Sequence, residues 1–208
     1  MLVVVNEERD AKRRIATVDE CKLDLTNELP IMFDAFESAL VLFTKEIVQT
    51  PVLARAISLE ASLLNSKMIQ CIQEYFPNNW KFGKYKRFML RVQGYTVLFK
   101  KLNGKNKPMN IKTLHSTSIM NQEQVSLFDS GHKSIDPILI FGYKKDRFGN
   151  IFDPKLVYID ESEVQWTITK TSISTSDGLT SVIRTNVEKV KPTLKEGLNV
   201  KKASSDSE

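Results

Sequence analysis

The chain has 208 residues, of which 41% are hydrophobic and 26% charged, and its formal net charge is +5 at pH 7. This balance is typical of one folded globular domain with an extension, and it argues against a disordered or membrane-embedded chain. No apolar run approaches the roughly 20 residues that span a bilayer, and the run at residues 2–5 is too short for a signal-peptide core. We therefore expect a cytoplasmic protein without a membrane partner.

The positive charge is concentrated in the middle of the chain. Residues 81–155 contain 15 Lys and Arg against 5 Asp and Glu, a net charge of +10, whereas residues 1–80 carry −4 and residues 156–208 carry −1. A local surplus of this size can attract a polyanion. The alternative is that Lys-rich loops keep a sheet soluble and protect its edges.

The order of patterns predicts a single α+β domain over residues 31–186, with helices over 31–76 and a mainly antiparallel sheet over 87–186. Residues 1–30 are highly charged and predict an arm or a short helix. Residues 187–208 have few large apolar groups and predict a disordered tail.

Two amphipathic helices are predicted from apolar residues at three- and four-residue spacing, the first over 31–48 and the second running to Phe76. Thr50-Pro51 separates them, because the residue before a proline avoids helical angles and Pro51 suits the first turn of a new helix. With two residues at the bend, the helices should pack as an antiparallel or L-shaped pair. The stripe of the second helix, which includes Cys71, suits packing on the sheet; a coiled-coil or dimer contact is the alternative.

The apolar period changes to two at Phe88, which predicts a β-hairpin with its turn at Gly94. Asn103-Gly104 predicts a turn that continues into a basic loop, and residues 109–135 predict a long connection without a clear period. Pro137–Tyr143 is apolar without alternation and predicts a central strand that is covered on both faces.

Further strands are expected after the central one, at 155–159, 164–169 and, as a last edge strand, 181–184. Successive strands with short turns predict an antiparallel meander.

Several common chemistries lack their signatures. The two histidines, His115 and His132, are expected to be exposed loop residues, and the two cysteines are too far apart for a redox pair or a zinc site. The chain contains no dinucleotide-binding glycine pattern, no phosphate-binding loop and no nucleophile elbow. We therefore expect no cofactor.

Carboxylates around the predicted sheet leave one enzymatic alternative open, a nuclease that uses Mg²⁺. Two carboxylates can hold a metal that polarises a phosphate, with a lysine beside the attacking water. The residues that would serve are Asp136, Asp160, Glu163 and Lys155. Their spacing does not follow the usual Asp, then Glu-x-Lys order, and turns alone explain carboxylates at such positions.

Basic and aromatic residues alternate in the first part of the predicted sheet, as in proteins that bind phosphates with cations and stack bases on rings. Trp80, Phe82 and Tyr85 are the rings expected to be exposed. The cations expected to bind nucleic acid are Lys81, Lys84, Lys86, Arg87, Arg91, Lys100, Lys101, Lys105 and Lys107.

The segment Gln124-Val125-Ser126-Leu127-Phe128 resembles the pentapeptide with which bacterial polymerases and accessory proteins dock on the DNA sliding clamp. The resemblance covers these five residues, and Val125 replaces the usual Leu. It implies that Leu127 and Phe128 enter a hydrophobic pocket of the clamp while Gln124 fixes the register. The alternative is that Leu127 and Phe128 belong to the domain's own core.

Together these patterns predict a non-enzymatic binding protein that acts on nucleic acid or on a complex that handles it. The metal-dependent nuclease and a protein–protein antagonist without nucleic-acid contact are the alternatives. The sequence leaves the oligomeric state open.

Overall fold

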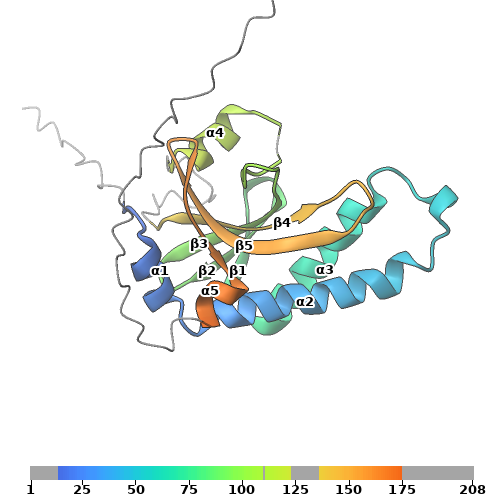
Figure 1. Ribbon diagram of the computed structural model, residues 1–208, viewed down its shortest axis with the longest axis horizontal. Coiled ribbons are helices and arrows are strands. Elements are labelled where there is room, and N and C mark those ends of the chain that lie inside the picture. The colour runs from blue at the N-terminus through green and yellow to red at the C-terminus, as the bar shows by residue number, and fades with distance from the viewer. Residues whose placement is uncertain (1–13, 110, 123–135, 175–208) are drawn as a thin grey trace, which may run out of the picture. The chain divides into compact units, whose positions relative to one another are not determined.

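A six-stranded sheet with two long helices on one face makes up most of the described chain (Figure 1). The computed structural model describes residues 14–109, 111–122 and 136–174. The helices are α2 (Glu28–Ile47) and α3 (Leu59–Tyr75). The strands lie side by side in chain order: β1 (Trp80–Gly83), β2 (Arg87–Val92), β3 (Tyr95–Lys101), β4 (Ile138–Lys145), β5 (Ile151–Asp160) and β6 (Glu163–Thr169). The α+β prediction is confirmed.

A short helix, α1 (Val18–Asp24), precedes the two long ones. Its N-cap residue is Thr17, whose hydroxyl accepts a hydrogen bond from the Glu20 amide while the Glu20 carboxylate accepts one from the Thr17 amide. This reciprocal cap explains why a charged stretch is helical here. Cys21 and Leu25 are completely buried in the core. The short helix predicted as one possibility for this charged stretch is therefore present, and its buried residues pack into the main core.

The main core lies between the long helices and the sheet. The rings of Phe33 and Phe36 of α2 contact Phe141 of β4, with centroids 5.1 and 5.5 Å apart. The apolar stripe of α3 is buried in the same core: Leu64, Met68, Cys71 and Ile72. The coiled-coil alternative is therefore wrong for these residues. Across the described ranges, no helix is both long and apolar enough to cross a membrane.

The connection between α2 and α3 is longer than predicted, because α3 begins at Leu59 and not at Pro51. The Arg55 guanidinium donates hydrogen bonds to the carbonyls of Ile47 and Thr50, at 3.0 Å each. These bonds satisfy carbonyls at the end of α2 and hold the following segment out of both long helices. The apolar side chains that the helical pattern placed on a buried face are fully exposed there, namely Leu53 and Ile57.

The sheet is not a pure meander, because β3 and β4 pair in parallel while every other neighbouring pair is antiparallel. Parallel neighbours cannot be joined by a tight hairpin turn and need a crossover connection between the two strands. The crossover contains helix α4 (Leu114–Met120), which lies across the sheet from α2 in Figure 1. The predicted long connection over 109–135 thus carries an element that covers the second face.

The central strand β4 is buried on both faces, as predicted. On the second face, Ile138 packs with Leu98 of β3 and Ile119 of α4. Gly142 is needed at its position because a Cβ there would overlap the side chain of Leu102, which lies over the strand. Beyond Leu102 the chain turns back, and Leu102 forms an isolated bridge with Pro108.

The two ends of the sheet differ from the prediction in detail. Strand β1 lies before the predicted start of the sheet at residue 87, and β5 begins at Ile151, earlier than residue 155. After β6, which agrees with the predicted strand at 164–169, a short helix α5 (Lys170–Ser174) follows. The edge strand predicted at 181–184 and the tail predicted at 187–208 lie outside the described residues.

Candidate functional site

Arg87 and Lys100 lie opposite each other on adjacent strands. Strands β2 and β3 pair with Leu90 opposite Val97, and continuing this antiparallel register by three residues places Arg87 opposite Lys100. Side chains alternate between the faces of a strand, so both cations project from the face that α4 covers. Like charges directly opposite on one face destabilise a sheet. The pair is therefore unfavourable for the fold by itself.

Both cations lose hydration in the folded protein. Burial lowers the pKa of the Lys100 ammonium, and the Arg87 guanidinium lowers it further. Burial also lowers the pKa of Arg87. Within the described ranges, neither side chain forms an ion pair with Asp or Glu, so no carboxylate there compensates for the lost hydration.

His115 contacts Arg87 from the crossover helix α4, with 2.6 Å between the His115 Nε2 and the Arg87 Nη1. An arginine N–H can only donate, so the imidazole nitrogen accepts this hydrogen bond and carries no proton. The N-cap residue of α4 is Thr113, whose hydroxyl accepts a hydrogen bond from the Ser116 amide. His115 is half-buried in this position. The prediction of an exposed loop histidine is therefore wrong for His115, while His132 lies outside the described residues.

The turn before β2 presents an aromatic ring and a further cation beside the pair. Tyr85 and Lys86 both have left-handed backbone conformations, with φ of 58° and 55°. Such angles cost about 1–3 kcal/mol for each residue other than glycine and persist where the surrounding structure imposes them. The Tyr85 side chain is 81% exposed and Lys86 is also exposed. The strained turn therefore displays both groups at the surface next to Arg87.

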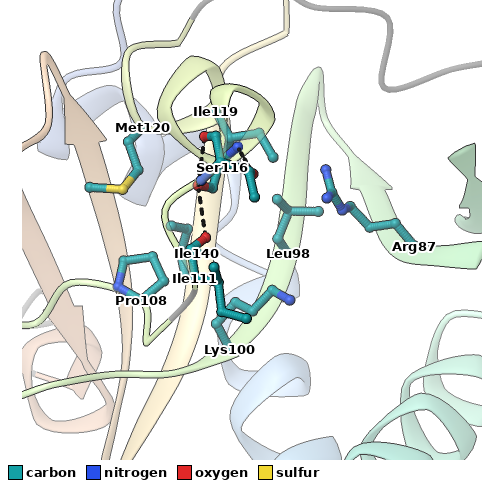
Figure 2. A pocket seen from close by; sticks show the side chains of 10 residues that line it. Arg87, Leu98, Lys100, Pro108, Ile111, Ser116, Ile119, Met120 and Ile140 are labelled. Atoms are coloured by element: carbon teal, nitrogen blue, oxygen red, sulfur yellow. Dashed lines mark hydrogen bonds between the residues drawn. The ribbon is translucent and has the colours of Figure 1, made fainter. Parts of the chain in front are cut away.

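Two neighbouring cavities share Arg87, Leu98 and Lys100 in their walls. The first, of about 240 Å³, lies between the sheet and the crossover segment (Figure 2). The second, of about 310 Å³, lies towards α3 and is also lined by Asn65 and Tyr85. The two cations therefore lie where the cavities adjoin. We call this surface, defined by Tyr85, Lys86, Arg87, Lys100 and His115, the Arg87–Lys100 site.

The structure gathers only some of the cations predicted to bind nucleic acid. Arg91 forms an ion pair with Asp136 at 2.6 Å, and Lys107 forms one with Glu163 at 2.7 Å. Lys101 follows Lys100 on β3, so its side chain lies on the opposite face. Three predicted cations, Lys86, Arg87 and Lys100, line the cavities. Lys81 lies in β1 and Lys105 in the turn after β3, while the Lys84 side chain is outside what the structure describes.

Of the rings predicted to be exposed, Tyr85 alone lies at this site. Trp80 is half-buried, and its ring packs on Phe88 with centroids 6.1 Å apart. Phe82 is 48% exposed and packs on the same Phe88 ring at 5.5 Å. Trp80 packs against the core at the β1 edge, because strand alternation turns it towards the helices, whereas Phe82 is exposed as predicted.

Of the carboxylates predicted for a nuclease, Asp160 and Glu163 lie opposite each other at the turn between β5 and β6, but each has its own partner and Asp136 is held by Arg91. Asp136 and Glu163 pair with the cations named above, and the Asp160 carboxylate accepts a hydrogen bond from the Glu161 amide at 2.9 Å. Lys155 pairs with Asp153 at 2.8 Å and lies five residues from Asp160 along β5, about 16 Å at the usual rise per residue. In the part of the chain that the structure describes, no three His, Cys, Asp or Glu side chains are placed to hold a metal ion.

The sequence did not predict that His115 contacts Arg87 or that Pro108, Ile111, Ser116 and Ile119 line a cavity, because this part of the chain has no regular apolar period. Thr113-x-x-Ser116, a weak form of the capping pattern, was the one signal of a helix start there. The docking pentapeptide Gln124–Phe128 lies outside the described residues. No protein-family model, curated protein or solved structure matches the chain.

Proposed function

We propose that this chain is a non-enzymatic binding protein that holds nucleic acid at the Arg87–Lys100 site. The observation that carries the proposal is the pair itself, two partly buried cations opposite each other without a described carboxylate. The repulsion between them is relieved when an anion binds, and phosphate oxygens accept strong charge-assisted hydrogen bonds from both side-chain types.

The neighbouring Tyr85 favours single-stranded nucleic acid as the ligand. Proteins that bind single strands combine cations that follow the backbone with exposed rings on which bases stack. The exposed Tyr85 ring precedes Arg87 by two residues and lines the cavity that Arg87 and Lys100 share. A ring and two cations within one site match that combination.

Titration of labelled single-stranded DNA and RNA at several salt concentrations, followed by fluorescence anisotropy, tests the proposal. Arg87→Gln and Lys100→Gln should each weaken binding and reduce the slope of log affinity against log salt by about 0.7 for each phosphate that the variant no longer neutralises. Lys101→Gln is the matched control, because it removes the same charge from the next residue on the other face. Equal weakening in all three variants would contradict a site at this pair.

Replacement of Tyr85 tests the stacking component separately. Tyr85→Ala should weaken binding by about 1–3 kcal/mol if one base stacks on the ring. Tyr75→Ala is the control, since Tyr75 lies on α3 and its hydroxyl shares a hydrogen bond with Ser38. Unchanged affinity in Tyr85→Ala would leave phosphate binding without base stacking.

The resemblance of Gln124–Phe128 to a clamp-docking peptide supports a second proposal, that the protein also binds a DNA sliding clamp. Surface plasmon resonance with a bacterial clamp tests it. The double variant Leu127→Ala, Phe128→Ala should lose clamp binding while its melting temperature stays unchanged. A strongly destabilised double variant, losing about 2–5 kcal/mol for each buried side chain, would assign both residues to the core instead.

A further inference from the structure

The first cavity has the composition of a small-ligand site. Its apolar surface comes from the second face of the sheet and from α4, and includes Leu98, Ile119 and Ile140. Figure 2 shows Leu98 between Arg87 and Lys100, with Ser116 and Ile119 on the helix above them. Mostly apolar cavities with a few convergent polar groups are typical of small-molecule sites.

The walls of this cavity are held by bonds within the crossover segment. The Ser116 hydroxyl donates to the carbonyls of Thr113, at 2.9 Å, and Ile111, at 3.2 Å. On the other side, Leu102 anchors the chain over Gly142, and its bridge with Pro108 brings that residue to the cavity. The cavity is therefore formed before any ligand binds.

Arg87 is oriented by His115, which accepts one of its N–H groups at 2.6 Å. A guanidinium has five N–H donors, so others remain for a ligand. The Lys100 ammonium has three donors, and no described side chain accepts from them. The cavity therefore presents two separate cationic donors above an apolar surface.

The charge of the cavity selects among phosphates. A phosphate monoester carries about −1.5 to −2 near pH 7, which matches two cations, whereas a phosphodiester within a strand carries −1. We propose that the first cavity binds a phosphate monoester, namely the terminal phosphate of a nucleic-acid strand, with Arg87 and Lys100 on the phosphate and the apolar surface under the terminal nucleoside. This inference rests on the proposed function and specifies which part of the nucleic acid occupies the cavity. His115 acts as a positioning residue.

Three versions of one fluorescent single-stranded oligonucleotide test the assignment, one with a 5′-phosphate, one with a 3′-phosphate and one with hydroxyls at both ends. We expect one phosphorylated version to bind about tenfold more tightly than the hydroxyl version. A tenfold difference in affinity corresponds to the contribution of about one charge-assisted hydrogen bond. The preference should disappear in Lys100→Met and in Arg87→Gln and remain in Lys101→Met. A circular dichroism melt of each variant shows that it is folded.

Equal binding of all three oligonucleotides, or a preference that survives in Lys100→Met, would overturn the terminal-phosphate assignment and leave the proposed function standing. Adenosine 5′-monophosphate, inorganic phosphate and a phosphoserine peptide serve as competitors. Binding of the mononucleotide without any oligonucleotide would support the cavity assignment and overturn the proposed function. Stronger competition by the phosphopeptide would overturn the nucleotide assignment, and absence of binding by every probe would overturn both proposals.

Discussion

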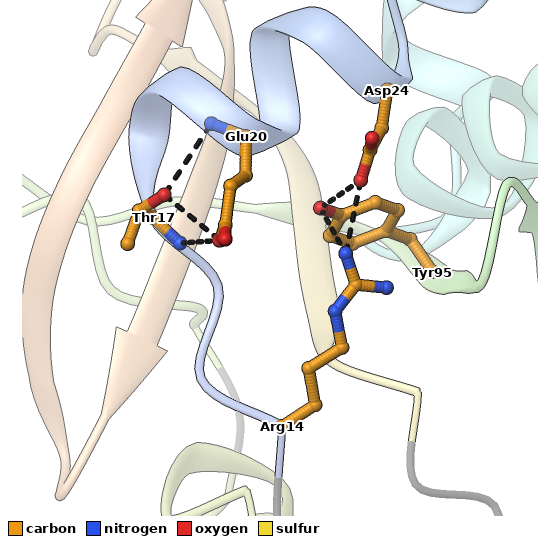
Figure 3. Close-up of polar contacts among 5 residues, drawn as sticks. All are labelled: Arg14, Thr17, Glu20, Asp24 and Tyr95. Carbon is orange, nitrogen blue, oxygen red and sulfur yellow. Dashed lines mark hydrogen bonds and ion pairs between the residues drawn. The ribbon is translucent and has the colours of Figure 1, made fainter.

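The hydroxyl of Tyr95 donates a hydrogen bond to the carboxylate of Asp24, 2.9 Å away, and so joins strand β3 to the end of helix α1 (Figure 3). Arg14 completes the contact, because its guanidinium donates to the same carboxylate at 2.9 Å and lies over the Tyr95 ring, 4.8 Å from the centroid. Tyr95 is fully buried. The N-terminal segment is therefore attached to the sheet that carries the Arg87–Lys100 site.

Removal of this hydroxyl should destabilise the domain. We expect Tyr95→Phe to lower the free energy of unfolding by about 1 kcal/mol, the usual net value of one hydrogen bond. Tyr75→Phe is the control, since its hydroxyl bond to Ser38 is exposed and should contribute little. Urea denaturation of both variants measures the difference, and equal values would show that the buried contact adds nothing.

Stability should fall at alkaline pH, partly because of Cys21. Burial raises the pKa of the Cys21 thiol from 9.0 to about 12, so the unfolded chain ionises at a lower pH than the folded one. The contribution of this thiol is fully present below pH 9 and is lost as the pH rises towards 12, at up to about 1.4 kcal/mol per pH unit. Between pH 8.5 and 10.5, the unfolding free energy of Cys21→Ala should therefore fall less than that of the wild type. The difference should be on the order of 1.4 kcal/mol. Thiol absorbance that titrates near pH 9 in the folded protein would contradict this.

The repulsion within the Arg87–Lys100 pair should lower the stability of the fold, while the same two charges favour nucleic-acid binding. Lys100→Met keeps the aliphatic stem and removes the charge, so we expect an increase in unfolding free energy of up to about 1 kcal/mol at pH 7. For a chain of this size that raises the melting temperature by about 2–4 °C. Nucleic-acid binding should weaken in the same variant. Lys101→Met, on the opposite face, should do neither, and a destabilised Lys100→Met would show that the ammonium has a stabilising partner.

Gly142 should tolerate no side chain while Leu102 is present. Gly142→Ala introduces a methyl group into the space of Leu102, and overpacking of this kind costs about 1–3 kcal/mol. In a double-mutant cycle with Leu102→Ala, the two destabilising effects should be less than additive, because the smaller residue makes room for the methyl group. Gly104→Ala is the control, since nothing lies within 4 Å of a Cβ at that position. Additive effects would show that the two sites do not interact.

Nucleic acid should remain intact when it binds. Labelled single-stranded DNA and RNA incubated with Mg²⁺ or Mn²⁺ should show no cleavage on a denaturing gel, because no three His, Cys, Asp or Glu side chains of the described residues are placed to hold a metal ion. Cleavage that disappears in Asp136→Ala or Glu163→Ala would support the nuclease alternative instead.

The spacing of apolar residues within each element was enough to predict much of the fold. The three- and four-residue spacing of Phe33 and Phe36, the two-residue period that begins at Phe88 and the apolar run at Pro137–Tyr143 each reflect which side chains one element buries. The errors also had local causes. Thr50-Pro51 is a good helix start, but Arg55 binds the carbonyls at the end of α2 and holds this segment in another conformation.

The amino-acid sequence by itself determined helix α2, most of helix α3, the hairpin, the central strand and the concentration of positive charge over residues 81–155. Only the tertiary structure decided that β3 pairs with β4 in parallel and that helix α4, which lies between them in the chain, brings His115 to Arg87. It also decided which cations are paired, leaving Arg87 opposite Lys100 while Arg91 and Lys107 meet carboxylates. The physical reason is that periodicity records the burial of each residue within its own element, whereas strand order and ion pairing depend on residues far apart in the chain.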